Sequence, residues 1–177
     1  DLVSWTFVNE IFHNVSIKPT DNNIALPPWK LERPKILYNE KNNNFVLWFH
    51  LGSHQPYKDS ITDVGLANCS TVCGDYQWIG SFQPDDKPSY DMGLYQDGYK
   101  GYLVRSVNNS YAGISQLNDD YTNTTGIISK GPRIEGVTIF LLDTYYLLGS
   151  HLTGWSPNAA ELCMTGNTEN VGLKDAK

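Results

Sequence analysis

Two short apolar runs that flank a turn recur three times along the chain. In the clearest copy, Val137 to Leu142 is followed by the turn Asp143-Thr144 and by the return run Tyr145 to Leu148. Short apolar runs bounded by turn residues are typical of well-buried strands in a hairpin. The other two copies lie in Leu31 to Ser53 and in Ser89 to Asn109. The pattern therefore predicts three hairpins of the same kind.

Each hairpin carries an acid a few residues ahead of an aliphatic–aromatic pair. These acids are Glu32, Asp91 and Glu135. Repeats of about 40 to 50 residues that are built from strand hairpins indicate a β-propeller. In a propeller the first strand of each blade lines the central channel, so equivalent positions on successive blades face one another. We therefore predict an all-β fold, a partial β-propeller over residues 1–177, in which the three carboxylates converge.

Further short strands are expected between the hairpins. They are predicted at Asp63 to Ala67 and at Tyr76 to Phe82, and Tyr111 to Leu117 is predicted as the outer strand of its blade. Asp119 to Lys130 is polar and is interpreted as a connector, and Ala159 to Met164 is expected to be the next strand. About three full blades with parts of the flanking ones result, whereas a propeller needs at least about four. Either the chain is a fragment or further chain or subunits complete the ring.

Composition narrows the class of protein. Charged residues make up 18% and aromatic residues 12% of the chain, and fifteen Gly with nine Pro fit an all-β chain rich in turns. The net charge of −6 argues against nucleic acid and against an anionic membrane as partners. No apolar run approaches the roughly 20 residues of a membrane span.

The cysteines and the glycosylation sequons point to an oxidising compartment. Cys69 and Cys73 lie close together in NCSTVCG, and a disulfide between them is favoured over two reduced, buried thiols. Cys163 is left over and is either a buried thiol or the partner of something outside this chain. No set of Cys and His at zinc-ligand spacing is found, so we predict neither a metal nor another cofactor. Four N-x-S/T sequons predict a secreted, extracellular protein with N-glycans, at Asn14, Asn68, Asn108 and Asn123.

Several segments resemble a known family. RPKILYN, NCSTVCG with GSFQP, DMGLYQDG and GSHLTGWSPN are similar to segments of the exo-β-1,3-galactanases of glycoside hydrolase family 43, in their secreted fungal form. The likeness runs in order from DLVSWTF to SPN. It implies a five-bladed propeller of which this chain would hold only a part. It also implies a galactan or arabinogalactan-type polysaccharide as substrate, cut at its ends with inversion at the anomeric carbon.

The same resemblance implies roles for the three acids. Glu135 matches the family's general acid, and Asp91 matches the carboxylate that holds and tunes that acid. Glu32 matches an acid in the sugar subsite nearest the cut, which acts either as the base or as a ligand of a sugar hydroxyl. Inverting hydrolysis needs two carboxyl groups about 6.5–9.5 Å apart, one protonated and one ionised. The structural alternative is that each acid caps a turn or pairs with Arg33, Lys35, Arg105 or Arg133.

Two departures from the family pattern bear on these roles. The family acid is usually followed by Ala-Pro, where this chain has Gly136-Val137. The family's modulating aspartate usually follows an arginine, where this chain has Tyr90. Loss of that cation is expected to change the electrostatics around Asp91. A second hypothesis is therefore a non-catalytic, sugar-binding or structural glycoprotein that kept the propeller.

Candidate sugar ligands complete the predicted site. Trp155 and Trp29 are candidate platforms for the apolar face of a galactose ring, with a core position as the alternative for each. Tyr90 and His151 are candidate sugar ligands beside the acids, although a structural role is favoured for His151. Trp48 is expected in the core and His50 is expected to be architectural.

Overall fold

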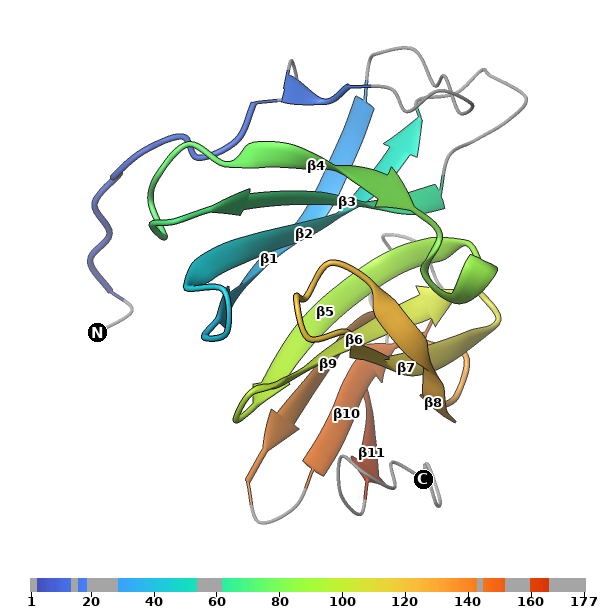
Figure 1. The fold of residues 1–177 in the computed structure, drawn as a ribbon. Coiled ribbons are helices and arrows are strands. Elements are labelled where there is room, and N and C mark those ends of the chain that lie inside the picture. The colour runs from blue at the N-terminus through green and yellow to red at the C-terminus, as the bar shows by residue number, and fades with distance from the viewer. Residues whose placement is uncertain are drawn as a thin grey trace.

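A computed structural model of the chain describes residues 3–13, 16–18, 29–53, 62–142, 145–151 and 160–165. These residues form eleven strands in three antiparallel sheets, with a short 3-10 turn at Pro84–Asp86 (Figure 1). Within the described ranges, no helix is long and apolar enough to cross a membrane. The predicted all-β fold is confirmed.

Each sheet is a meander whose strands follow one another in chain order. The first sheet holds β1 (Trp29–Asn39), β2 (Asn44–Ser53), β3 (Thr62–Cys69) and β4 (Gln77–Phe82). The second sheet holds β5 (Ser89–Asp97), β6 (Lys100–Val107), β7 (Tyr111–Leu117) and β8 (Thr124–Lys130). The third sheet holds β9 (Glu135–Leu141), β10 (Tyr145–Ser150) and β11 (Ala160–Thr165). The first strand of each sheet contacts that of the next, β1 against β5 and β5 against β9, as in successive propeller blades (Figure 1).

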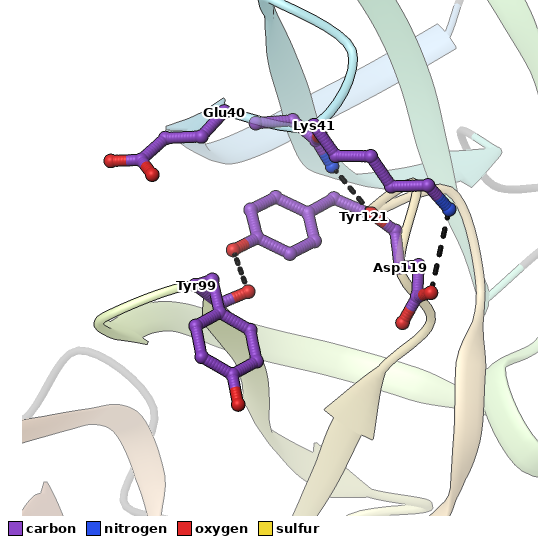
Figure 2. A pocket seen from close by; sticks show the side chains of 6 residues that line it. Glu40, Lys41, Tyr99, Asp119 and Tyr121 are labelled. Atoms are coloured by element: carbon purple, nitrogen blue, oxygen red, sulfur yellow. Dashed lines mark hydrogen bonds and ion pairs between the residues drawn. The ribbon is translucent and has the colours of Figure 1, made fainter.

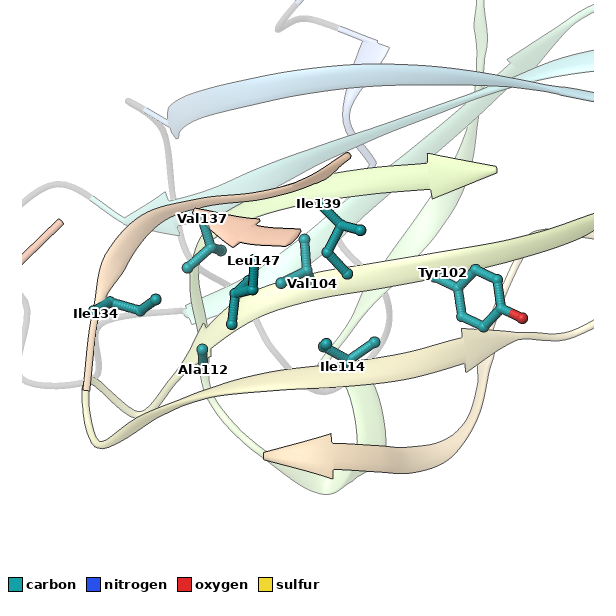
Figure 3. Packing of buried hydrophobic residues seen from close by; sticks show 8 residues of the cluster. All are labelled: Tyr102, Val104, Ala112, Ile114, Ile134, Val137, Ile139 and Leu147. Carbon is teal, nitrogen blue, oxygen red and sulfur yellow. The ribbon is translucent and has the colours of Figure 1, made fainter. Parts of the chain in front are cut away.

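Hydrophobic clusters fill the spaces between neighbouring sheets. One cluster joins the first sheet to the second, and the indole N–H of Trp48 there donates to the Tyr121 carbonyl at 2.9 Å, which confirms Trp48 as a core residue. A second cluster joins the second sheet to the third, and Figure 3 shows its side chains, Tyr102, Val104, Ala112, Ile114, Ile134, Val137, Ile139 and Leu147. Because the second sheet is covered on both faces, β6 is buried over residues 101–107. This is why the hairpins read as continuous apolar runs and not as alternating ones.

The outer strand of the second sheet corrects a prediction. Asp119 to Lys130 is not a connector throughout, because Thr124–Lys130 forms β8, and Tyr111–Leu117 is consequently the third strand of its sheet. As the outermost strand, β8 has few buried side chains and so carries a polar sequence. The Asn118 side chain accepts the backbone N–H groups of Thr122 and Asn123, which turns the chain back just before β8. The predicted turn Asp143-Thr144 lies outside the described residues.

The cysteine prediction also needs correction. Cys69, at the end of β3, and the exposed Cys73 are free thiols in this structure, and the expected disulfide is not formed. The loop between them is closed by backbone hydrogen bonding, since the Gly74 N–H donates to the Thr71 carbonyl at 3.2 Å. The Asn9 side chain further holds the Cys73 carbonyl at 3.0 Å. The side chain of Cys163 lies outside the described residues.

Candidate active site

The three predicted acids lie near the starts of the three neighbouring inner strands. Glu32 is in β1, Asp91 is in β5 and Glu135 is the first residue of β9. The inner strands contact one another in this order, and all three acids are only partly buried. The structure therefore brings the three acid-bearing positions to the same end of adjacent strands, as the repeat pattern predicted.

A β-bulge recurs at each acid. Glu32 and Lys35 of β1 face His50 and Trp48 of β2, so β1 holds one residue more than its partner over this stretch. The same extra residue occurs in β5 between Ser89 and Met92 and in β9 between Glu135 and Thr138. Bulges bend a strand and turn side chains away from the regular alternation, and they are frequent beside active sites. The three blades thus repeat a local geometry that redirects side chains near each acid.

Arg33 joins two of these blades. It lies in the bulge of β1, and its Nε and a terminal nitrogen donate to the two oxygens of Asp91 at 2.8 and 2.7 Å. A bidentate guanidinium–carboxylate pair of this kind is both strong and directional. Arg33 has φ 55°, a backbone region that is uncommon for any residue except glycine. The strained backbone of Arg33 and its bidentate pair with Asp91 together fix Asp91 relative to β1.

The charges of all three acids act on the pKa of Arg33. The pKa of Arg33 is raised above its ordinary value, first by the hydrogen bond to Asp91 and then by the charges of Asp91, Glu32 and Glu135, against the effect of burial. One guanidinium therefore lies within electrostatic reach of the three carboxylates.

Asp91 also contacts the residue that comes directly after the predicted acid. The Gly136 N–H donates to Asp91 Oδ2 at 3.0 Å. Gly136 has φ 61°, which glycine adopts without strain and alanine does not. The departure from the family's Ala-Pro after the acid therefore has a local cause: this backbone turns in the left-handed region to present its N–H to Asp91.

The second departure is compensated from another blade. Tyr90 stands where the family has an arginine, and Arg33 of the neighbouring blade supplies a cation to Asp91 instead. Among the four basic residues considered as structural partners, Arg33 alone pairs with one of the three acids within the described residues. Lys35 instead contacts the Pro34 carbonyl, Arg105 pairs with Asp85, and Arg133 donates to the Asn109 carbonyl.

Glu32 has its own surroundings. Its carboxylate pairs with Lys30 at 3.0 Å, and it lies opposite His50 in the β1–β2 register. His50 is buried and stacks on the ring of Tyr90, with centroids 6.0 Å apart. Burial lowers the pKa of His50, while the charge of Glu32 and a hydrogen bond to the Ser89 backbone act in the opposite direction. This contact places Tyr90 and His50 together beside two of the acids.

The other predicted ligands are placed less fully. Trp29 is half-buried and packs against the cluster that contains Leu47 and Phe49, which favours the core alternative for its ring. His151 is exposed directly after β10. Trp155 lies outside the described residues, so its place at the rim of the site stays a prediction.

The predicted glycosylation positions differ in exposure. Asn108 and Asn123 are exposed at turns, whereas Asn68 is half-buried in β3, a strand with partners on both sides. Asn14 lies outside the described residues. The exposed pair are therefore the more accessible acceptors.

Solved structures with the same arrangement of sheets are known. An exo-β-1,3-galactanase from Phanerochaete chrysosporium, solved with β-1,3-galactotriose, superposes with a TM-score of 0.81 at 31% identity over 96% of this chain. The chain shares the fold of the family 43 exo-β-1,3-galactanases. An exo-β-1,3-galactanase from Clostridium thermocellum gives a TM-score of 0.73 at 28% identity and covers 81% of this chain. The resemblance seen in the sequence is thereby confirmed.

The chain matches only part of each of these enzymes. It spans 39% of the length of the Phanerochaete enzyme and 34% of that of the Clostridium enzyme. No protein-family model and no curated protein matches the chain.

Proposed function

We propose that this chain carries acid–base machinery of an inverting glycoside hydrolase that removes galactose from the ends of β-1,3-galactan. The observation that carries the proposal is that Asp91 is held from two neighbouring blades. The guanidinium of Arg33 donates two hydrogen bonds to it, and the N–H of Gly136 donates another. These contacts tie β1, β5 and β9 together around the three acids. Solved structures that are similar to this chain contain β-1,3-galactotriose, which supports a galactan-type oligosaccharide as ligand.

The proposed reaction uses each acid in one role. Glu135 donates a proton to the glycosidic oxygen, and the bond from that oxygen to the anomeric carbon breaks. A water molecule adds to the anomeric carbon from the opposite face and gives its proton to a base, so a β-linked galactose leaves as the α-anomer. Asp91 positions the backbone next to Glu135 through Gly136. Glu32 serves as the base or binds a sugar hydroxyl.

Replacement of the proton donor tests this proposal. In Glu135→Gln the amide keeps the shape of the side chain but cannot donate the proton in the same way. Hydrolysis of β-1,3-galactotriose should fall by about 10²- to 10⁴-fold, while binding of the trisaccharide persists. Glu10→Gln, an exposed acid outside the sheets, is the matched control and should hydrolyse like the unmodified protein. Proton NMR of the first product should show the α-anomer. Equal rates in the two variants would overturn the assignment of Glu135.

A second candidate function is sugar binding without hydrolysis. It is favoured by the ion pair between Lys30 and Glu32, because the ammonium group occupies a carboxylate oxygen that a base or a sugar ligand would use. In this case β-1,3-galactotriose binds to the unmodified protein and stays intact, and Glu135→Gln changes only its affinity.

The proposed setting is extracellular, with N-glycans on Asn108 and Asn123. Their exposure at turns supports the proposal, because a glycan there meets solvent. Peptide mapping of the natural protein before and after enzymatic removal of N-glycans should show occupancy at both positions. Bare peptides at both would count against passage through a glycosylating pathway.

A further inference from the structure

A pocket lies at the opposite end of the inner strands from the three acids. It has a volume of about 160 Å³, small for a drug-sized site but enough for one small ring. It is formed where the β1–β2, β5–β6 and β7–β8 turns meet, and its lining residues are Asn39, Glu40, Lys41, Tyr99, Asp119 and Tyr121. About 25 Å of extended strand separates Asp91 from Tyr99, so this pocket is separate from the candidate active site.

The walls of the pocket are fixed by hydrogen bonds between two sheets. The buried Asn39 side chain donates to the Asp119 carbonyl at 2.8 Å, and Lys41 reaches the Asp119 carboxylate at 3.4 Å. The Tyr121 hydroxyl donates to the Tyr99 carbonyl at 2.6 Å. Figure 2 shows the Tyr121 ring between the turn that carries Lys41 and the turn that carries Tyr99. The pocket is therefore formed in advance of any ligand.

Backbone strain accompanies this arrangement. Tyr121 is 2% exposed and has φ 57°, a backbone region that is strained for a bulky residue. The contacts of its carbonyl with Trp48 and of its hydroxyl with Tyr99 hold it there. Strain of this kind persists only where the surrounding structure fixes it, and it places the Tyr121 ring at the base of the pocket.

The groups at the pocket edge are suited to a neutral sugar. Tyr99 is 77% exposed, and neither its hydroxyl nor the Glu40 carboxylate has a hydrogen bond or ion pair with the residues that the structure describes. Two carboxylates, of Glu40 and Asp119, outweigh the one ammonium of Lys41, so an anionic ligand is disfavoured. An aromatic face beside acceptors and donors matches a ring that has one apolar face and several hydroxyls.

We propose that this pocket is a second carbohydrate-binding site, which takes one neutral sugar residue of a polysaccharide chain. The choice of a galactose polymer rests on the proposed function, whereas the site itself does not require hydrolysis. A chain held at both places is anchored at a distance from the bond that is cut, which raises its effective concentration at the acids.

Titration of the labelled Glu135→Gln protein with β-1,3-galactotriose tests the inference by NMR. Saturable shifts of the backbone N–H signals of Glu40, Tyr99 and Tyr121 are expected. Adding Tyr99→Ala should weaken binding at these signals by about 2- to 10-fold, because one aromatic face is lost, while Tyr99→Phe should retain it. The matched control is Ile79→Ala, which removes an exposed side chain of β4 and should leave the titration unchanged.

The outcomes separate this inference from the proposed function. Shifts at Tyr99 and Tyr121 without shifts at Gly136 would support the pocket and count against the candidate active site. No shift at Tyr99 and Tyr121 when Gly136 is saturated would overturn the pocket. Shifts that are equally strong after Tyr99→Ala would overturn it as well.

Discussion

Two arginine–aspartate pairs use the same chemistry in different parts of the molecule. Arg105 is 0% exposed, and its pair with Asp85 lies within the second sheet and its preceding turn. Arg33 is about half exposed, and its pair with Asp91 crosses between two sheets at their inner strands. In each pair one member has a positive φ, Asp85 in the first and Arg33 in the second.

The surroundings of the two aspartates explain the difference. Both Asp85 oxygens are taken up inside the sheet, since the hydroxyls of Ser115 and Thr124 donate to them at 2.7 and 2.8 Å. Among the described residues, the Asp91 carboxylate is hydrogen-bonded only to Arg33 and to the Gly136 N–H, and it lies beside two further acids. The buried Arg105–Asp85 pair therefore stabilises the second sheet, whereas the more exposed Arg33–Asp91 pair positions the groups of the candidate active site. Stability should depend on the first and activity on the second.

The largest expected effect on stability is from Arg105→Met. Removal of one partner leaves Asp85 with its charge uncompensated, which typically costs about 3–5 kcal/mol for a buried pair. The melting temperature should drop by about 10 °C or more in a chain of this size. Thermal unfolding followed by circular dichroism measures it. Arg133→Met, at an exposed arginine, is the control and should melt close to the unmodified protein. A drop of less than about 3 °C for Arg105→Met would contradict a stabilising role of the Arg105–Asp85 pair.

Arg33→Met should show the opposite pattern, with little loss of stability and a large loss of activity. The pair that it breaks is partly exposed, so the free energy of unfolding should change by at most about 1 kcal/mol. Hydrolysis should fall by about 10²-fold, because Asp91 and the backbone beside Glu135 lose their position. Steady-state kinetics of galactotriose cleavage measures the loss. Arg33→Lys keeps the charge without the fork and should recover only part of the rate. Unchanged kcat in Arg33→Met would remove Arg33 from the positioning role.

The smallest effect concerns pH. Burial lowers the pKa of His50 below its ordinary value of 6.5, so the unfolded chain binds a proton at a pH where the folded chain does not. Above about pH 6.5 the neutral His50 does not reduce the free energy of unfolding. As the pH falls from there toward the pKa of His50 in the folded protein, the free energy of unfolding decreases. Melting temperatures between about pH 7.5 and 5.5 should therefore decline less in His50→Gln than in the unmodified protein. Parallel curves would show that the charges of Glu32 and Asp91 outweigh burial.

Much of this architecture could be predicted from the sequence. The hairpins were visible because sheets that are packed on both faces require continuous apolar strands such as β2 and β6. The acids were visible because each occurs at the same place in its repeat. The outer strand β8 was missed, since a strand with one exposed edge and an exposed face has no need of apolar residues.

The contacts of the site could not be predicted in the same way. The pairing of Arg33 with Asp91 depends on how β1 meets β5 and on a bulge that no local preference indicates, because arginine before proline is an unexpected place for positive φ. The position of Gly136 was visible only as a departure from the family's pattern. The pocket at Tyr99 needs three turns from two sheets, which lie far apart in the sequence.

The most direct measurement is a crystal structure of the Glu135→Gln protein with β-1,3-galactotriose. The proposed mechanism predicts a terminal galactose within hydrogen-bond distance of Glu32, with residue 135 facing the glycosidic oxygen and Arg33 still hydrogen-bonded to Asp91. A trisaccharide that contacts none of these side chains, or an Arg33 turned away from Asp91, would contradict it.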